Sequence, residues 1–390
     1  MEVISDEVAF HDGNHNMVPR FVRWRERDWL VFRSGSGHRS PDGRIVVVSS
    51  LDLTEWTGSK TVIDTPLDDR DPSIFVCGDR LFATSLSVDR RFLDDSRPFD
   101  GIRSQGSCRC FVSYTEDGRE WSTPVQALPD NYVIWWPIVV GDTVYAGVQR
   151  RIPDSFDFET FRSTSGLSGL ARPLEFANKV DRQAELWKSE DGINWEQVGI
   201  ICDRDQASET ALALLPDSRM VGFVRHDDHT ASREDRNMPE VAVSDPPYER
   251  WDSSYRFNFP NNGPCIGSIG GRIVTCSRAF FDDPRTPMTD DLCRDRIRGL
   301  ILGFFDVENA GWSPTLVIPH HTGSRFDVTS MDESLNFPDI SYAWMRDEGK
   351  GIFSMSYYEG YKGRPSDIRF AKIRIGGHPT SSACRVGGDL

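Results

Sequence analysis

The sequence predicts an all-β protein folded as a six-bladed β-propeller, and three observations support this fold class. A short turn motif of a hydroxyl residue, an aspartate and a tryptophan recurs along the 390 residues. Its copies lie roughly 55 to 74 residues apart, which is an interval typical of propeller blades. Runs of alternating apolar residues bounded by turn residues separate the copies and predict short strands.

The turn motif has three regular copies and one degenerate copy. They are Ser50 to Trp56, Thr115 to Trp121, Ser189 to Trp195 and, degenerate, Ser244 to Trp251. We expect the aspartate to accept backbone N–H groups in a tight hairpin, with the tryptophan packed beneath. Asp52, Asp117 and Asp191 are therefore predicted to form turns rather than to act as catalysts.

The apolar runs place six blades along one domain of residues 1–390. The first four are expected at Val18–Trp56, Pro72–Trp121, Tyr132–Trp195 and Thr210–Trp251. A fifth blade contains an incomplete turn motif at Gly311-Trp312, and a sixth blade contains the apolar runs Ile352–Tyr358 and Ile368–Ile375. The amino-terminal segment Glu2–Phe10 alternates like a strand and is expected to complete the last blade, which removes free sheet edges.

Composition limits the classes of partner. The net charge of −15 argues against nucleic acid or an anionic membrane, and no apolar run reaches the length of a membrane helix. The amino terminus shows no signal peptide, which fits a cytoplasmic protein or a mature secreted or periplasmic form. Eight scattered cysteines suggest buried thiols, so we expect no metal and no cofactor. The oligomeric state stays open.

The turn motif, Ser/Thr-x-Asp-(Gly)-x-x-Trp, resembles the Asp-box of sialidases. That resemblance implies turns on the face away from the active site. Ser208-Glu209-Thr210 resembles the sialidase segment whose Glu opens the fourth blade, and Arg225 and Arg278 resemble the arginines of the following strands. Pro338-Asp339-Ile-Ser-Tyr342 is similar to the segment that presents the tyrosine nucleophile.

These residue types suit one chemistry. A phenol is a poor nucleophile until a neighbouring carboxylate takes its proton, and a neutral phenol approaches an anionic sugar without charge repulsion. Glu209 and Tyr342 form such a pair. Guanidinium groups at Arg225 and Arg278 would hold a carboxylate or sulfate through paired N–H bonds.

The sequence departs from sialidases in the first blade. Met17 stands where their first arginine would be, and the nearby Arg20 and Arg33 are out of register. The stretches from His15 to Gly43 and Asp68 to Pro72, with Tyr358 near the carboxyl terminus, instead resemble sialidase-like bacterial proteins labelled exo-sialidase. Arg70-Asp71-Pro72 also resembles five-bladed invertase-like and arabinanase-like propellers, in which the aspartate grips sugar hydroxyls; this is the alternative fold.

Two sets of site residues follow. We expect Tyr342, Glu209, Asp71, Asp42 and His38 to carry the chemistry, with Asp42 and His38 as candidates to protonate a leaving oxygen. Substrate binding is assigned to His15, Arg33, Arg70, Arg225, Arg278 and Tyr358.

Three functions remain open. The leading hypothesis is a sialidase-like glycoside hydrolase acting on an acidic or sulfated glycan. The second is a uronate lyase, in which His15, His38 and Tyr342 remove and return protons. The third is a propeller that binds carbohydrate or protein without catalysis.

Overall fold

The computed structural model describes residues 1–38, 40–88, 108–152, 181–227, 238–257, 262–281, 297–321, 338–361 and 363–376. Every helix or strand found in these ranges is a β-strand. The same ranges contain no helix that could span a membrane. The prediction of an all-β chain is confirmed for this part of the protein.

The strands form antiparallel sheets whose members follow chain order. The first sheet contains β2 (His15–Trp24), β3 (Arg27–Gly35), β4 (Arg44–Ser50) and β5 (Thr57–Ile63). The next contains β6 (Asp68–Cys77), β7 (Arg80–Val88), β8 (Cys108–Thr115) and β9 (Val125–Gln126). It is followed by β10 (Tyr132–Val140), β11 (Thr143–Ile152), β12 (Asp181–Ser189) and β13 (Glu196–Cys202).

The second half of the chain repeats this pattern. One sheet contains β14 (Ala207–Leu214), β15 (Met220–His226), β16 (Glu240–Ser244) and β17 (Asp252–Arg256). Another contains β18 (Asn262–Ile269), β19 (Arg272–Phe281), β20 (Ile297–Asp306) and β21 (Gly311–Pro319). The last strands are β22 (Pro338–Gly349), β23 (Ile352–Tyr361) and β24 (Ser366–Arg374).

The amino-terminal strand β1 (Glu2–Phe10) pairs antiparallel with β24. The segment Glu2–Phe10, which the sequence predicts as a strand, thus lies beside the last strand of the chain. A single parallel pair, His15 with Ser366, links β2 to β24 and joins the first and last sheets into one eight-stranded sheet. The first two strands and the last strand are thus held together by hydrogen bonds.

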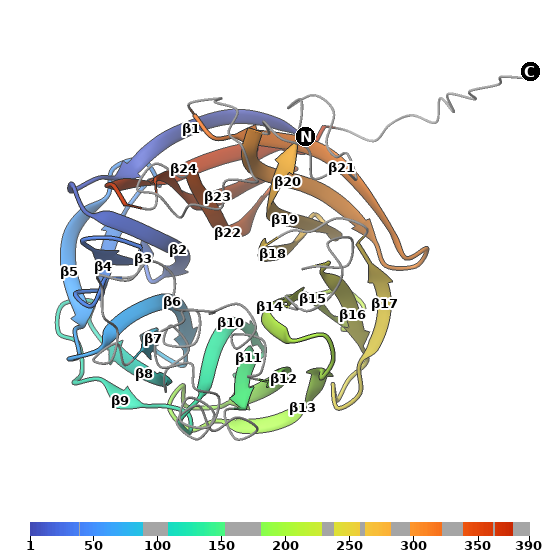
Figure 1. Cartoon of the computed structure of the whole chain (residues 1–390), viewed down its shortest axis with the longest axis horizontal. Coiled ribbons are helices and arrows are strands. Elements are labelled where there is room, and N and C mark those ends of the chain that lie inside the picture. Colours follow the sequence, from blue (N-terminus) through green and yellow to red (C-terminus); the bar gives the residue numbers. More distant parts are fainter. Residues whose placement is uncertain are drawn as a thin grey trace, which may run out of the picture.

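The sheets are arranged around a common centre, with the first strand of each sheet innermost (Figure 1). Contacts between these inner strands run from β2 through β6, β10, β14 and β18 to β22, and from β22 back to β2. The inner strands are covered on both sides, and β10, for example, buries the apolar residues Val133 to Trp136. The position of each inner strand, and of its ends near the centre, therefore depends on the sheets on both sides of it.

Each inner strand has a register shift near its amino-terminal end. The shifts lie between Met17 and Arg20, Arg70 and Ser73, Ile134 and Trp136, Ala207 and Thr210, Asn262 and Cys265, and Ser341 and Trp344. Four of these irregularities contain a residue with positive φ: Val18, Asp71, Gly263 and Tyr342. A bulge turns one side chain away from the regular alternation of the strand. Each inner strand therefore redirects a side chain near the same end of the central axis.

The three regular turn motifs fold alike between the third and fourth strands of their sheets. In the second copy, Asp117 Oδ1 accepts the N–H groups of Arg119 at 2.7 Å and Glu120 at 2.9 Å. Asp52 and Asp191 accept the corresponding pairs in the other copies. These backbone bonds lower the pKa of the Asp117 carboxyl, because they favour its charged form.

Each tryptophan of these turns packs on the preceding sheet. The Trp56 ring lies 5.6 Å from that of Phe370 in β24, and the Trp195 ring lies 5.8 Å from that of Phe75 in β6. Trp121 packs against the cluster that contains Trp24 and Trp29. The prediction that the three tryptophans occupy equivalent hairpins is confirmed.

The turns and the bulges lie at opposite ends of the sheets. In an antiparallel sheet the first and third strands run in the same direction. The bulges lie near the start of the first strand, whereas the turn motifs follow the end of the third strand. The turn aspartates are consequently far from the residues that the bulges present.

A turn aspartate should therefore affect stability but not catalysis. We expect Asp191→Ala to lower the melting temperature by roughly 2–5 °C, because two backbone N–H groups lose their acceptor. Differential scanning fluorimetry measures this shift. The matched control is Glu196→Ala, which removes only an exposed pair with Lys188 on the same hairpin. Equal melting temperatures for the two variants would contradict the role of the aspartate.

Candidate functional site

The bulges of β14 and β22 bring Glu209 and Tyr342 together. Tyr342 donates its hydroxyl hydrogen to Glu209 Oε1 at 3.0 Å. From the end of β15, Arg225 Nη1 lies 2.7 Å from the same carboxylate oxygen and donates to Tyr342 Oη at 3.2 Å. Arg225 Nη2 lies 2.7 Å from Asp227 Oδ1, which fixes the guanidinium plane. The arrangement has the geometry of a phenol, its base and a cation that stabilises the phenolate.

Burial sets the protonation of this pair. It raises the pKa of Tyr342 above its usual value, and the Glu209 carboxylate raises it further. Burial also raises the pKa of Glu209, and the charge of Arg225 opposes this shift. The raised pKa of Tyr342 keeps the proton on the phenol at rest, and Glu209 accepts that proton only when negative charge leaves the phenol oxygen.

The bulge of β6 presents a second carboxylate near the same place. Asp71 has a φ of 47°, and Arg70 Nε lies 3.1 Å from its Oδ2. The charge of Asp71 acts on both Glu209 and Tyr342. Arg70, Asp71, Glu209, Arg225 and Arg278 each keep 11–17% of the side chain exposed. These partly exposed groups define the chemical character of the centre: three cations and two carboxylates.

Asp339, also on β22, is the hub of a second cluster. Its side chain is completely buried. His38 Nδ1 lies 2.7 Å from its Oδ2, and Tyr358 donates to its Oδ1 at 2.9 Å. Arg278 and Arg298 each lie 3.8 Å from Oδ1. Although burial alone would raise the pKa of Asp339, the contact with His38 and the charges of Arg298 and Arg278 hold it well below its usual range.

His15 lies against the same cluster. Its Nε2 is 3.7 Å from Asp339 Oδ2, and its ring is 5.4 Å from that of His38. Burial lowers the pKa of His15 to about 4 and that of His38 well below its usual value. Both rings are therefore neutral near pH 7, the form in which a histidine accepts a proton.

The buried histidines predict a loss of stability in mild acid. The unfolded chain binds protons below about pH 6.5, whereas folded His15 and His320, each with a pKa lowered by burial to about 4, do not. Each histidine should thus reduce the free energy of unfolding by about 1.4 kcal/mol per pH unit between pH 6.5 and pH 4. Urea unfolding at pH 7 and pH 4.5 measures this loss.

The same measurement on His15→Gln should show a smaller acid effect, since one titrating group is gone. Identical pH dependence in His15→Gln and wild-type protein would contradict the assignment.

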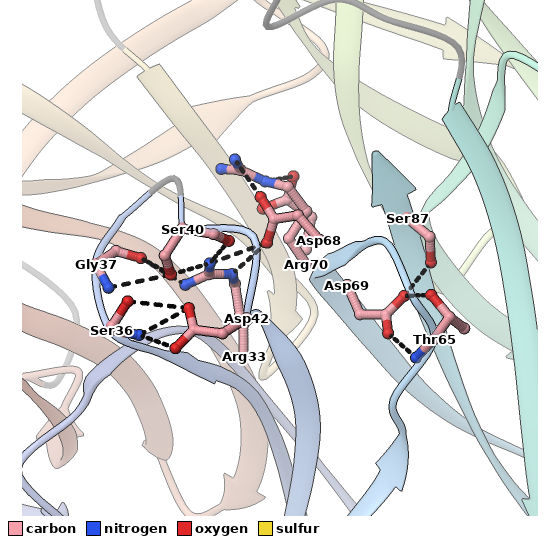
Figure 2. A network of polar contacts seen from close by, with 11 residues as sticks. Arg33, Ser36, Gly37, Ser40, Asp42, Thr65, Asp68, Asp69, Arg70 and Ser87 are labelled. Carbon is pink, nitrogen blue, oxygen red and sulfur yellow. Dashed lines mark hydrogen bonds and ion pairs between the residues drawn. The ribbon is translucent and has the colours of Figure 1, made fainter. Parts of the chain in front are cut away.

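Arg33 lies in a buried network with Asp68 and with the loop that follows β3 (Figure 2). Its Nη2 and Nε donate to Asp68 Oδ1 at 2.9 and 3.1 Å, and its Nη1 donates to the carbonyl of Gly37 at 2.9 Å. The fully buried guanidinium fixes the loop after β3. The structure therefore does not bring Arg33, which the sequence suggested for substrate binding, to the exposed part of the centre.

Asp42 closes the same loop. Its carboxylate accepts the Ser36 N–H and the Ser36 hydroxyl, at 3.1 and 3.0 Å (Figure 2). Its contacts among the described residues are all local, and the backbone and hydroxyl bonds lower its pKa although burial opposes them. The structure does not bring Asp42 into contact with Tyr342 or Glu209, whereas it does bring together Tyr342, Glu209 and Arg225.

Arg20 does not replace the missing first arginine at the centre. It is buried, and Nη1 donates to Ser73 Oγ at 2.5 Å and to the carbonyl of Trp135. Its guanidinium lies 4.8 Å from the centre of the Trp135 ring. Arg20 thus joins β2, β6 and β10 in the core, and the side chain at the predicted arginine position is the buried Met17.

Sequence reasoning missed Asp339 as a hub and missed Arg298 entirely. Asp339 lies three residues before Tyr342 in the same motif, and this proximity indicated that the two side chains belong to one site. Arg298 is the second residue of β20. Its Nη1 donates to the carbonyl of Pro338 at 2.6 Å. No motif marks it, because its role depends on the approach of β20 to β22.

Comparison with known proteins supports the fold but not a family. No protein-family model and no curated protein sequence matches this chain. Among solved structures, a protein of unknown function from Dyadobacter fermentans DSM 18053 is similar over 96% of this chain and 99% of its own, with a TM-score of 0.66 and 15% identity.

Sialidases are also structural neighbours. Trypanosoma rangeli sialidase, in complex with the inhibitor DANA, has a TM-score of 0.56 and 12% identity over 93% of this chain. The match spans 55% of that sialidase, so this chain accounts for about half of its length. Leech intramolecular trans-sialidase, complexed with 2,7-anhydro-Neu5Ac, has a TM-score of 0.55 and 10% identity, covering 95% of this chain and 70% of its own. At these identities the comparisons establish a sialidase-like fold.

Proposed function

We propose that the chain is a single six-bladed propeller, closed by β1, that hydrolyses glycosidic bonds next to an anionic sugar. The observation that carries this proposal is the contact between Tyr342 Oη and Glu209 Oε1, with Arg225 on both. The turn motifs, as Asp-boxes, and the sialidase neighbours support the same class. Fold similarity alone would not assign a reaction.

The proposed first step forms a bond between Tyr342 Oη and the anomeric carbon. Glu209 takes the phenol proton, and the bond from the anomeric carbon to the leaving oxygen breaks. We assign the protonation of that oxygen to Asp71 in its acid form, because its side chain is partly exposed at the centre, as Glu209 is, whereas Asp42 is bonded within its own loop. In the second step Asp71 accepts a proton from water, the water oxygen bonds to the anomeric carbon, the bond from that carbon to Tyr342 Oη breaks, and Glu209 returns the proton to the phenolate.

Charge at the centre favours an anionic substrate. Arg70, Arg225 and Arg278 are partly exposed there, in a protein whose net charge is −15. A planar guanidinium binds carboxylate or sulfate through paired N–H bonds. Arg20 is not available as a third sialidase-type arginine, so we favour a uronic acid or a sulfated sugar over sialic acid.

A second candidate, a uronate lyase, is favoured by the Asp339 cluster. His15 and His38 are neutral near pH 7 and lie beside two arginines that could neutralise a uronate carboxylate. In this reaction a histidine removes the proton next to the carboxylate, and Tyr342 protonates the leaving oxygen.

A glycan panel tests both candidates. It contains sialyl, glucuronyl, galacturonyl and sulfated oligosaccharides, and products are identified by mass spectrometry in ¹⁸O-labelled water. The proposed hydrolase incorporates one ¹⁸O atom at the new reducing end. An unsaturated product without ¹⁸O supports the lyase instead, and binding without turnover across the panel contradicts both enzymes.

A further inference from the structure

Outside the proposed site, a cysteine, a histidine and a glutamate meet at the ends of neighbouring strands. Cys202 ends β13, His226 ends β15 and Glu240 begins β16. One ligand atom from each lies within 4.8 Å of the other two. All three residues are buried. They are far apart in the sequence, so only the pairing of these sheets brings them together.

The tautomer of His226 directs a lone pair into this cluster. Its Nδ1 lies 3.1 Å from the backbone carbonyl of Asp205. A carbonyl only accepts, so Nδ1 carries the hydrogen and Nε2 of the neutral ring is an acceptor. Nε2 has no hydrogen-bond partner, although the side chain is only 1% exposed, and it faces Glu240 Oε2 at 3.6 Å. A ring nitrogen and a carboxylate that face each other in a buried place must share either a proton or a metal ion.

The geometry points to a zinc site, and we propose that Cys202, His226 and Glu240 bind one Zn²⁺ ion, with water as the fourth ligand. Thiolate, imidazole and carboxylate are the protein ligands of zinc. Tetrahedral coordination at ordinary zinc bond lengths separates ligand atoms by about 3.3–3.7 Å, which matches the 3.6 Å between His226 and Glu240. The His226–carbonyl contact is the outer hydrogen bond that usually orients a zinc-bound histidine.

The site would stabilise the strand end that carries Arg225. Successive side chains on a strand point to opposite faces, and Arg225 contacts Glu209 while His226 contacts Glu240. Arg204 Nη2 donates to both Glu240 oxygens, at 3.0 and 2.9 Å, from a half-exposed position, and orients the carboxylate. A zinc ion would thus fix β15 on the face opposite the proposed active site, and its binding does not depend on the proposed reaction.

Metal analysis tests the site directly. The full-length protein is stripped with a chelator, reloaded with ZnCl₂ or CoCl₂, and dialysed. We expect one zinc per chain, a higher melting temperature with zinc, and a thiolate-to-cobalt charge-transfer band. Cys202→Ser should lose that band. Loss of a residue that only hydrogen-bonds to a metal ligand typically lowers affinity by roughly 10- to 100-fold, and His226→Gln, which removes a ligand itself, should lower zinc affinity by more than that.

The control is Cys77→Ser, which removes a buried thiol outside the cluster and should retain zinc and the cobalt band. The proposal is overturned if reloaded wild-type protein retains no zinc and shows no thermal shift. It is equally overturned if Cys202→Ser and His226→Gln bind zinc as the wild type does, because the ion would then lie elsewhere.

Discussion

Replacing Tyr342 with phenylalanine is expected to lower kcat by about three orders of magnitude or more while the fold is retained. The substitution removes the oxygen that forms the covalent bond and keeps the ring that packs 5.5 Å from Trp135. Steady-state kinetics on the glycan found by the panel measures the effect, and circular dichroism verifies the fold.

Glu209→Gln should reduce kcat by a similar order, because a neutral amide does not accept the phenol proton. His15→Gln is the discriminating control, and a hydrolase should keep most of its kcat. If His15→Gln abolishes turnover while Glu209→Gln is tolerated, the lyase mechanism is correct. Full activity of Tyr342→Phe contradicts both mechanisms.

Removing the Asp339 carboxylate is expected to cause the largest loss of stability, about 3–5 kcal/mol in the free energy of unfolding. Asp339→Ala leaves Arg278 and Arg298 without the buried charge that compensates them, and Tyr358 loses its acceptor. Urea unfolding monitored by tryptophan fluorescence measures the loss.

Asp339→Asn separates charge from hydrogen bonding in this cluster. The amide keeps an acceptor for Tyr358 but lacks the negative charge, so its stability should fall between those of wild type and Asp339→Ala. Glu308→Ala, at an exposed pair with Arg219, should be indistinguishable from wild type. Wild-type stability in Asp339→Ala would show that the cluster contributes nothing net to folding.

The repeating parts of the fold were predictable because each is determined by a short stretch of neighbouring residues. The turn motifs carry their own hydrogen-bond acceptor, and in the second copy the residue with φ of 77° is Gly118, as a left-handed turn favours. The alternating run Glu2–Phe10 signalled β1 in the same way. The pairing of Glu209 with Tyr342 was predicted because each lies in a recognisable motif on an inner strand.

The parts that the sequence did not predict depend on contacts between distant segments. Arg33 was predicted to bind substrate, and Arg20 lies near the position of the missing arginine. In the structure Arg33 pairs with the buried Asp68, and Arg20 donates to the carbonyl of Trp135. Asp339 becomes a hub only when the loop after β3 and the strands β19, β20, β22 and β23 converge. Cys202, His226 and Glu240 show no ligand spacing, because three strand ends from two sheets bring them together.

The central claim is that Tyr342 is a nucleophile, and covalent trapping tests it most directly. The protein is incubated separately with 2,3-difluorosialic acid and with a 2-deoxy-2-fluoro-glucuronosyl fluoride, then digested and analysed by mass spectrometry. The proposal predicts a glycosyl adduct on the peptide that contains Tyr342, absent from Tyr342→Phe. Turnover of a glycan to an unsaturated product, with no adduct on Tyr342 from either probe, would contradict it.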